Sequence, residues 1–468
     1  MKKQTLAIFI STGIFFPPEF CLEAGKELER AAAEAGYGTL FLPEGATKYG
    51  GVQSMEEAGV YAKFLKEHQG EYEGVILSLP NFGNENSALA ALKDCGVPIL
   101  IQAYPDIIGK MDVANRRDAF CGKISIMNLF HQAGLGFTAY APHTVHPLSN
   151  AFKKQLHDFA AVCRVVKGMK NFTVGAVGAR TTPFKTTRID ETALQKTGIT
   201  VETMDLSEIF DRIHKVDVQS EAYGKKQEVY KNYCNWGKIP EASYSTIVKA
   251  AVILDEVIEE YHLNSLGIRC WNEFEKYLGI CPCVILSELS NRGIPAACEV
   301  DVGNAVSMYA LQLASNQPAV TLDWNNNYGD DENKCILFHC GPAARDMLAA
   351  ESEIVDNPLQ AQAHGYGHSW GASMARFKES PMTYLSAKTE NGRLGFYIGQ
   401  GRFTEDVLEI RYFGNAGVAE IPQLQKLLLG VGSNGFKHHV AVTLSSTEEI
   451  LREAFSKYLN YEIVELTR

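Results

Sequence analysis

The chain has 468 residues, of which 46% are apolar, and its formal net charge at pH 7 is −11. A chain of this length is too long for a single hydrophobic core, so two or three domains are expected. The composition is typical of a globular α/β protein. The sequence contains no block of basic residues, which argues against a nucleic-acid partner. No apolar run reaches the ~20 residues of a membrane span, which argues against a membrane partner. Eleven cysteines without a CxxC pair predict buried free thiols and a cytoplasmic location.

The first 168 residues alternate short apolar runs with amphipathic segments. Strands are predicted at 4–10, 38–42, 74–79 and 97–102, with helices at 20–36, 54–68 and 85–95. The first run is short and no cleavage site follows it, so it is interpreted as a strand rather than a secretory signal. Strand–helix alternation predicts a doubly wound parallel sheet, and no glycine-rich nucleotide-binding loop is present.

A second α/β domain is predicted over 169–322 and a β-rich domain over 323–468. In the second domain, strands are expected at 172–178, 199–204, 265–271 and 294–299, with long helices over 207–262. Further on, strands are expected at 334–339, 382–388, 393–399, 407–413 and 438–443, before a last helix at 447–458. Many strands with glycine-rich turns are typical of a barrel or sandwich.

Three polar side chains end predicted apolar runs between Gly293 and Gly341: Glu299, Asp323 and His339. Carboxylates and imidazoles in such positions suit a divalent metal site or acid–base chemistry. For any one of these residues alone, the more ordinary explanation is that Glu299 and Asp301 face solvent and that Asp323 only caps a turn. His438 and His439 begin a late strand, where alternation would send only one of them into a given site.

Two further polar clusters are candidate ligand contacts. The loop after strand 172–178 carries Arg180, Lys185 and Arg188, whose donors suit an anionic or polyhydroxylated ligand. Arg117 and Lys123 belong to a cluster that precedes an apolar helical face. A turn in the first case and a solvated helix start in the second would explain these residues without a ligand.

Several motifs, taken in order, resemble the L-fucose isomerase and L-arabinose isomerase superfamily. They are RRDAFCGKISIMNLF at 116–130, GARTTPFKTTRIDE at 178–191, DLSEIF at 205–210, IRCWNEF at 268–274, GIPAACEVDVGNA at 293–305, LDWNN at 322–326, LFHCG at 337–341 and KHHVAV at 437–442. Each motif is modest by itself, but their common order covers nearly the whole chain. The resemblance implies two α/β domains, a β-rich domain, and a sugar ketol isomerase.

The resemblance also implies a metal site made by Glu299, Asp323, His439 and His339, with Glu299 and Asp323 as the catalytic carboxylates. Whether His438 ligates or touches substrate, and whether His339 ligates, stays open. Aldose–ketose isomerisation through a cis-enediol needs a Lewis acid and proton-transferring carboxylates, for which Mn²⁺ is suited, with Mg²⁺ or Co²⁺ as alternatives.

The substrate is expected to be a small sugar held by Trp271 as an apolar platform, with donors around it. The donors are Arg180, Lys185, Arg188, His438, Asn325, Arg117 and Lys123. A neutral deoxy or pentose sugar of the fucose or arabinose type is the first expectation, and a sulfo- or phosphohexose such as sulfoquinovose is the alternative. A non-catalytic sugar-binding protein is a further alternative, and the resemblance implies a homo-oligomer, a trimer or hexamer.

Overall fold

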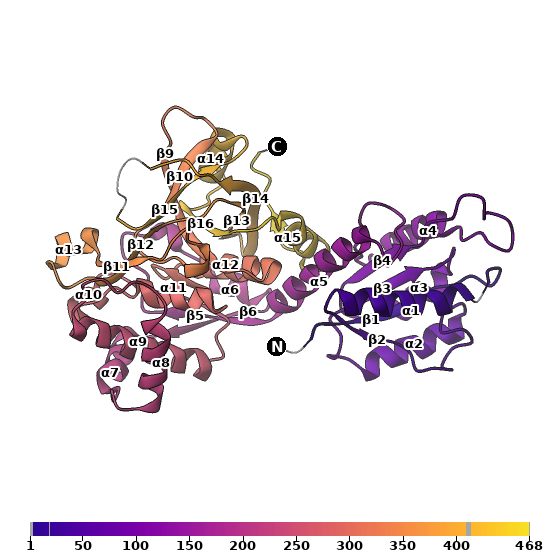
Figure 1. The fold of residues 1–468 in the computed structure, drawn as a ribbon, viewed down its shortest axis with the longest axis horizontal. Helices are drawn as coiled ribbons and strands as arrows, with labels where there is room; N and C mark the ends of the chain where they lie inside the picture. The colour runs from indigo at the N-terminus through magenta and orange to yellow at the C-terminus, as the bar shows by residue number, and fades with distance from the viewer. Residues whose placement is uncertain (1–2, 18, 409–412, 468) are drawn as a thin grey trace. The chain divides into compact units, whose positions relative to one another are not determined.

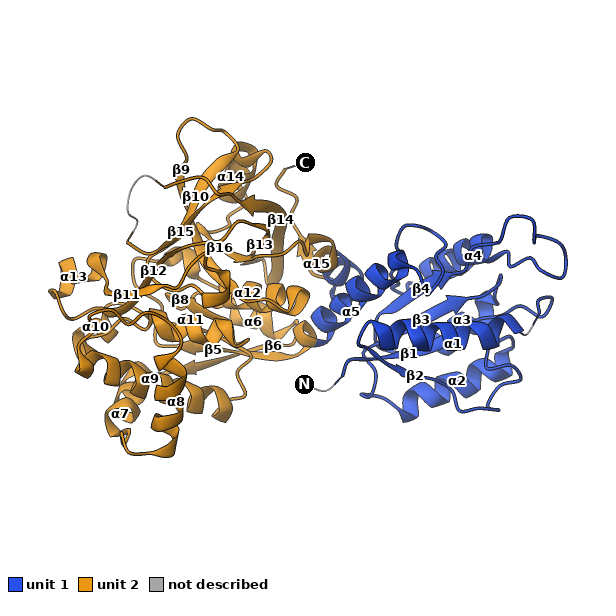
Figure 2. Cartoon of the chain, viewed as in Figure 1, with its two compact units in different colours: residues 1–167, 453–460 blue, residues 168–452, 461–468 orange. Residues whose placement is uncertain are grey.

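The computed structural model of the chain describes residues 3–17, 19–408 and 413–467. The chain forms two compact units, which Figure 2 colours separately. The first unit contains residues 1–167 and 453–460, and the second contains residues 168–452 and 461–468.

The first unit is built on a four-stranded parallel sheet with helices on both faces (Figure 1). Its strands, in the spatial order β2-β1-β3-β4, are β2 (Gly38–Leu40), β1 (Thr5–Ile10), β3 (Gly74–Leu79) and β4 (Ile99–Ala103). The helices are α1 (Glu19–Glu34), α2 (Met55–Glu67), α3 (Glu85–Leu92), α4 (Ala119–Gln132) and most of α5 (Asn150–Lys170). Residues of β1, β3 and β4 enter two separate apolar clusters, one on each face, as expected for strands covered on both sides.

The second unit contains another four-stranded parallel sheet, with the order β6-β5-β7-β8. The strands are β5 (Phe172–Val177), β6 (Ile199–Met204), β7 (Ser265–Ile268) and β8 (Ala296–Cys298). The connecting helices are α6 (Glu191–Gln195), α7 (Leu206–Lys215), α8 (Glu221–Lys231), α9 (Glu241–Glu260), α10 (Glu273–Leu278) and α11 (Cys283–Asn291), together with the 3₁₀ turn η1 (Lys185–Thr187). One large apolar cluster joins helices α7 to α11 to the sheet.

The second unit also contains a mixed nine-stranded sheet in the order β11-β12-β15-β10-β9-β16-β13-β14-β17. The strands are β9 (Ala319–Asn327), β10 (Lys334–His339), β11 (Glu353–Asp356), β12 (Trp370–Arg376), β13 (Ser380–Glu390), β14 (Arg393–Phe403), β15 (Asn415–Glu420), β16 (His439–Thr443) and β17 (Glu462–Ile463). Because β14 also pairs with β15, the strands from β15 to β14 close into a barrel around an apolar core. The predicted fold class, two parallel α/β sheets followed by a barrel-like β-rich part, is confirmed.

Helix α12 (Val302–Ser315) connects the parallel sheet to the barrel. It follows β8, and its Asn304 side chain donates to Thr321 of β9 at 3.0 Å. The remaining elements are α13 (Pro358–His364), α14 (Leu424–Ser433), α15 (Glu448–Ala454), the 3₁₀ turn η2 (Arg345–Met347) and a π-helical turn at Phe455–Leu459.

The β-rich part differs from the sequence-based expectation in several elements. Strands β11, β12 and β15 and helix α14 were not predicted, because they are short or interrupted by glycines. Of the strand expected at 407–413, residues 407–408 are not in a strand and 409–412 lie outside the described residues. A domain boundary at 322/323 would cut β9, and we therefore propose a boundary before Ala319.

The last predicted helix, at 447–458, is divided between the two units, because residues 453–460 belong to the first unit. There the Tyr458 hydroxyl lies 2.8 Å from the Thr138 hydroxyl and donates to the Ile99 carbonyl at 3.3 Å. The C-terminal segment therefore completes the unit that the N-terminal half begins.

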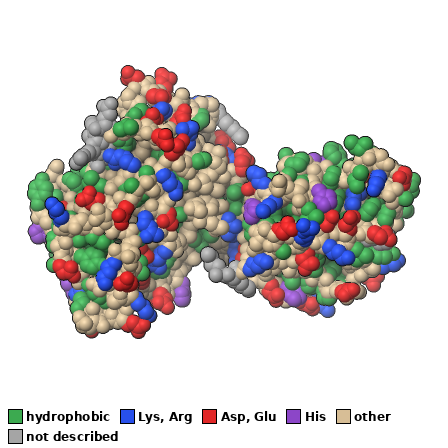
Figure 3. All heavy atoms as spheres, in the orientation of Figure 1, with side chains coloured by type: hydrophobic (Ala, Val, Ile, Leu, Met, Phe, Trp, Pro, Cys, Tyr) green, Lys and Arg blue, Asp and Glu red, His purple; other side chains and the backbone are tan. Residues whose placement is uncertain are grey.

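All eleven cysteines are free, and eight of them are buried, as expected for apolar runs. On the face drawn in Figure 3, acidic and basic side chains are mixed within each unit rather than gathered into a basic stripe. None of the described helices combines the length and the apolar character that a membrane crossing requires.

Candidate active site

Glu299 stands at the carboxyl end of β8, the position where ligands bind in parallel α/β sheets. Glu299 (φ 64°) and Val300 (φ 54°) both adopt the left-handed conformation before α12 begins. This conformation is unfavourable for a β-branched residue and costs on the order of 1–3 kcal/mol. Gly267 of β7 makes the turn possible, since a Cβ there would lie 3.1 Å from the Val300 carbonyl carbon.

Asp323 and His439 are brought together by strand register. They are directly opposite each other in the antiparallel pair β9–β16, so their side chains share one face of the sheet. The neighbouring residues, Leu322 before Asp323 and Val440 after His439, point into the barrel core. Asp323 and His439 therefore lie on the outside of the barrel, the side that α12 covers through Thr321.

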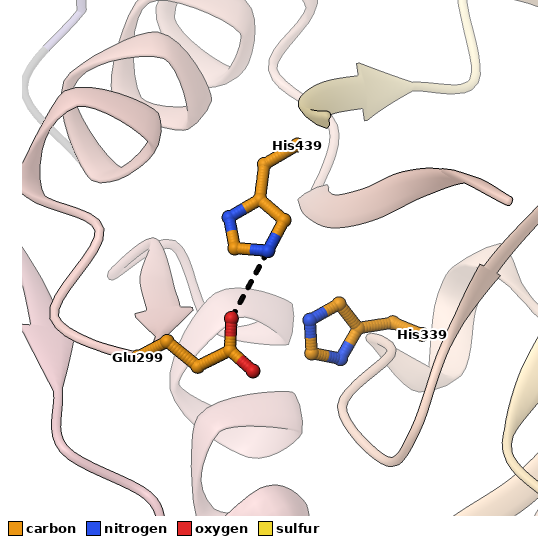
Figure 4. Close-up of side chains that lie close together, drawn as sticks. All are labelled: Glu299, His339 and His439. Atoms are coloured by element: carbon orange, nitrogen blue, oxygen red, sulfur yellow. Dashed lines mark ion pairs between the residues drawn. The ribbon is translucent and has the colours of Figure 1, made fainter. Parts of the chain in front are cut away.

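Two groups of side chains meet at His439: one contains Glu299 and His339, and the other contains Asp323 and His438. The Nε2 atom of His439 lies 3.0 Å from Glu299 Oε2 and 3.5 Å from Asp323 Oδ1. Figure 4 shows the Glu299 carboxylate facing the His439 and His339 rings, whose centroids are 5.9 Å apart. Glu299, His339 and His439 are buried, whereas the Asp323 side chain is 23% exposed and so leaves an approach from solvent.

The donor set fits a divalent cation. Glu299, His339 and His439 each offer a ligand atom within 4.8 Å of the others, as do Asp323, His438 and His439. Glu299 Oε2 and Asp323 Oδ1 are buried, and neither accepts a hydrogen bond although both lie near an imidazole. Burying a carboxylate oxygen without a partner costs free energy, and a bound cation would be such a partner. A set of carboxylate and imidazole ligands suits Mn²⁺ and related ions.

The electrostatics of the cluster keep Glu299 ionised. Burial raises the pKa of Glu299, but the His439 imidazole outweighs burial and leaves this pKa below its ordinary value. Burial lowers the pKa of His439, but the carboxylates of Asp301 and Glu299 outweigh it and raise this pKa to about 10. An ionised Glu299 is the form that ligates a metal or accepts a proton.

Sequence reasoning missed two buried charged residues behind His439. Asp301 was considered only as a solvent-facing carboxylate, yet it is fully buried and its Oδ2 accepts from His439 Nδ1 at 2.9 Å. Lys437, also buried, donates to Asp301 Oδ1 at 2.5 Å. The sequence offered one signal for them, their spacing: Asp301 lies two residues after Glu299, and Lys437 lies two residues before His439.

Aromatic rings border the cluster. Trp271 donates from Nε1 to Glu299 Oε1 at 3.1 Å, so the predicted sugar platform also holds a candidate ligand. Phe184, which sequence reasoning did not select, lies edge-on to Trp271 at 5.4 Å and to His438 at 5.8 Å between ring centroids. These rings give the site an apolar wall of the kind that sugar faces contact.

His438 faces the cluster together with His439, contrary to the expectation of strand alternation. Its Nε2 lies 3.6 Å from Asp323 Oδ1, and its side chain is 45% exposed. Alternation fails here because β16 begins only at His439. His438 thus occupies the solvent side of the cluster, where a substrate would enter.

Four other predicted contacts lie in the second unit. Arg180 is half-buried and donates to the carbonyls of Thr181 and Phe184, which fixes the loop that carries Phe184. Lys185 and Arg188 are exposed on and after η1, and half-buried Asn325 accepts from the Asn326 side chain. Substrate contact by these residues stays a prediction.

Arg117 and Lys123 lie in the first unit and are buried rather than solvated. Arg117 lies over the rings of Phe20 and Tyr104 and donates to the Pro80 carbonyl at 2.9 Å. Lys123 donates to the His143 carbonyl at 2.8 Å, and burial lowers its pKa to about 8. Their role toward a substrate stays a prediction.

Comparison with protein families agrees with this arrangement. A model described as "Fucose/sulfoquinovose isomerase, N-terminal domain" matches residues 7–170, and one described as "L-fucose isomerase, C-terminal domain" matches residues 337–467. The two matches together cover more than half of the 468 residues. The chain belongs to the L-fucose isomerase superfamily. Its members are sugar isomerases, which are intramolecular oxidoreductases, so the predicted enzyme class is confirmed and the non-catalytic alternative is set aside.

Several relatives of the chain carry the name sulfoquinovose isomerase. A sulfoquinovose isomerase of Alkalicoccus urumqiensis is 22% identical over 414 residues, which are 86% of this chain and 88% of that protein. Those of Priestia aryabhattai and Priestia megaterium are 28% identical over 306 residues, 63% of this chain and 65% of theirs. A solved structure of a solute-binding protein from Burkholderia multivorans matches 68% of this chain and 95% of its own chain, at 9% identity. Its TM-score of 0.19 is too low for any conclusion about fold.

Proposed function

We propose that this protein is a divalent-metal-dependent aldose–ketose isomerase whose metal is held by Glu299, Asp323, His439 and His339. The observation that carries the proposal is that Glu299 and His339 form one group of candidate ligands with His439, and Asp323 forms a second group with the same His439, while one buried oxygen of each carboxylate accepts no hydrogen bond. Mn²⁺ suits the donor set best, with Mg²⁺ or Co²⁺ as alternatives. When bound, such an ion supplies Lewis acidity toward the sugar oxygens.

The chain's own residues perform the proton transfers. The isomerisation moves the C2 proton of the aldose to C1 and the proton of the C2 hydroxyl to the C1 oxygen, so that no atom is gained or lost. Glu299, kept ionised by its surroundings, and the more accessible Asp323 are placed to accept and return these protons. Trp271 holds one oxygen of Glu299 and thereby orients the carboxylate.

We further propose that the sugar is an anionic hexose of the sulfoquinovose kind rather than a neutral deoxy sugar or pentose. The support comes from relatives that are named sulfoquinovose isomerases. Arg180, on the loop beside the site, and exposed Lys185 and Arg188 are the candidate partners of the sulfonate, since guanidinium and ammonium donors suit such groups.

The test uses the purified protein, stripped of metal with a chelator and then supplied with Mn²⁺. Aldoses are compared at equal concentration: sulfoquinovose, L-fucose and L-arabinose. We expect activity only with a divalent ion and the highest kcat/KM with sulfoquinovose. Faster turnover of the neutral sugars would refute the anionic substrate, and full activity after exhaustive metal removal would refute the metal site.

A further inference from the structure

Behind the metal site, four buried side chains form a continuous line from Lys437 through Asp301 and His439 to Glu299. Lys437 and Asp301 are 5% and 0% exposed, and His439 is 1% exposed. The successive contacts are 2.5 Å from Lys437 Nζ to Asp301 Oδ1, 2.9 Å from Asp301 Oδ2 to His439 Nδ1, and 3.0 Å from His439 Nε2 to Glu299 Oε2. The proposed reaction uses only the last two residues of this line.

Asp301 is placed to fix His439 rather than to bind the metal itself. Both of its oxygens are already used: Oδ1 accepts from Lys437 and from the Asn304 backbone N–H at 2.9 Å, and Oδ2 accepts from His439. Asp301 is therefore absent from the groups whose ligand atoms converge among the described residues. As the N-cap of α12, it is also held by a rigid element whose N-terminus favours a negative charge.

The hydrogen bond to Asp301 determines which nitrogen of His439 is left for the metal. An imidazole can ligate through either nitrogen, and the partner of the other nitrogen selects the tautomer and the ring orientation. Because the Asp301 carboxylate can only accept, Nδ1 carries a proton, and Nε2 is the nitrogen that faces Glu299 and Asp323. Rotation of the ring by half a turn would break the bond to Asp301.

Lys437 keeps Asp301 in the form that this role requires. A carboxylate buried without a partner is strongly disfavoured, and the ammonium group of Lys437 compensates its charge at 2.5 Å. Gly303 leaves the room for this contact, since a Cβ there would lie 2.8 Å from Lys437 Nζ. The pair is electrically neutral as a whole, so it adds no net charge next to the proposed ion.

We propose that Asp301, held by Lys437, is a positioning residue that orients His439 with Nε2 free to ligate the metal. The inference rests on the proposed metal site and adds to it two residues that never touch the sugar or the ion. A residue that hydrogen-bonds to a metal-ligating histidine typically raises metal affinity by about 10- to 100-fold.

The test is the affinity of the metal-free protein for Mn²⁺ alone, measured by titration calorimetry without any sugar. Asp301→Asn keeps the shape but removes the charge that holds the imidazole, and we expect the Kd for Mn²⁺ to rise about 10- to 100-fold. The matched control is Asp205→Asn, the same change at the exposed N-cap of α7, with an unchanged Kd. An Asp301→Asn variant that binds Mn²⁺ within twofold of the wild type would overturn the proposal.

A second measurement keeps the proposal testable if Asp301→Asn does not fold. Nitrogen-15 spectra of histidine-labelled wild-type protein with Mg²⁺, with His439 assigned by its loss in His439→Gln, report which ring nitrogen carries the proton. We expect the proton on Nδ1, and a proton on Nε2 would overturn the proposal. A wild type that binds Mn²⁺ but isomerises no sugar would refute the proposed function alone, and one that binds no divalent ion would refute both.

Discussion

Glu299, like Asp323, has a double role in the proposed reaction, as a candidate ligand and a candidate base. Glu299→Gln retains the shape and the bond from Trp271 but loses the charge. We expect kcat to fall by ~10²–10⁴-fold, the range of general acid–base catalysis, with the unfolding transition little changed.

The control for Glu299→Gln is Glu208→Gln on the surface of α7, where the side chain is 58% exposed and kcat should not change. Retention of more than about a tenth of the activity in Glu299→Gln would contradict the role of the carboxylate in proton transfer.

Glu275 in α10 provides a pH-dependent test of stability away from the metal cluster. It is 2% exposed, its Oε1 lies 3.2 Å from the Cys281 thiol, its Oε2 has no hydrogen-bond partner, and burial raises its pKa from 4.5 to about 7. The folded chain therefore keeps this proton up to about pH 7, whereas the unfolded chain loses it near pH 4.5. The free energy of unfolding contributed by this group consequently falls as the pH rises through that window.

Glu275→Gln should remove this penalty. We expect the variant to be more stable than the wild type at about pH 8, by up to ~3 kcal/mol, and the advantage to shrink to nothing as the pH falls below the carboxyl's unfolded pKa. Urea unfolding at several pH values measures it. A difference that stays constant with pH would show that Glu275 is not held protonated by burial.

At the scale of elements, the site depends on the turn between β8 and α12. Gly267→Ala would place a Cβ 3.1 Å from the Val300 carbonyl carbon and 3.2 Å from the Asp301 nitrogen, and both are backbone atoms that cannot rotate away. We expect a loss of ~1–3 kcal/mol in the free energy of unfolding and weaker Mn²⁺ binding, because Glu299 and Asp301 flank this turn.

Gly224→Ala in α8 is the control for that change, since nothing lies within 4 Å of its added Cβ. In a helix interior this substitution should stabilise the protein by up to ~1 kcal/mol and leave Mn²⁺ affinity unchanged. If Gly267→Ala behaved in the same way, the close approach of β7 to the turn would not be what shapes the site.

Elements with a continuous apolar run or a clear hydrophobic period could be predicted from the sequence, and elements with neither could not. The parallel strands and their helices followed from continuous apolar runs separated by amphipathic segments, as in β3 and β5. Strands β12 and β15 carry glycine, serine and asparagine at buried positions, so their side chains give no alternating pattern. Only pairing with neighbouring strands identifies them.

At the scale of the whole molecule, the first unit exposes several large apolar side chains. Phe15, Ile108 and Val113 are 79%, 93% and 80% exposed. Exposed apolar side chains are a feature of surfaces that associate when they form a contiguous patch. They support the homo-oligomer that the family resemblance implies.

We expect light scattering to give a particle mass of three or six times the 51.6 kDa of one chain. Ile108→Asp should lower that mass, whereas Leu429→Asp, at a side chain that is 75% exposed on α14, should not. A wild type of one chain mass would contradict the assembly, and an unchanged mass in Ile108→Asp would exclude this surface from it.

The sequence alone determined the order of the domains, the superfamily and the identity of the carboxylates and histidines in the cluster. These follow from local patterns and motif order, which survive without knowledge of distant contacts. Only the tertiary structure decided that Asp301 and Lys437 are buried partners of His439, that His438 faces Asp323, and that residues 453–460 return to the first unit. The physical reason is that burial and pairing of a charged side chain depend on residues more than a hundred positions away, on which local sequence patterns carry no information.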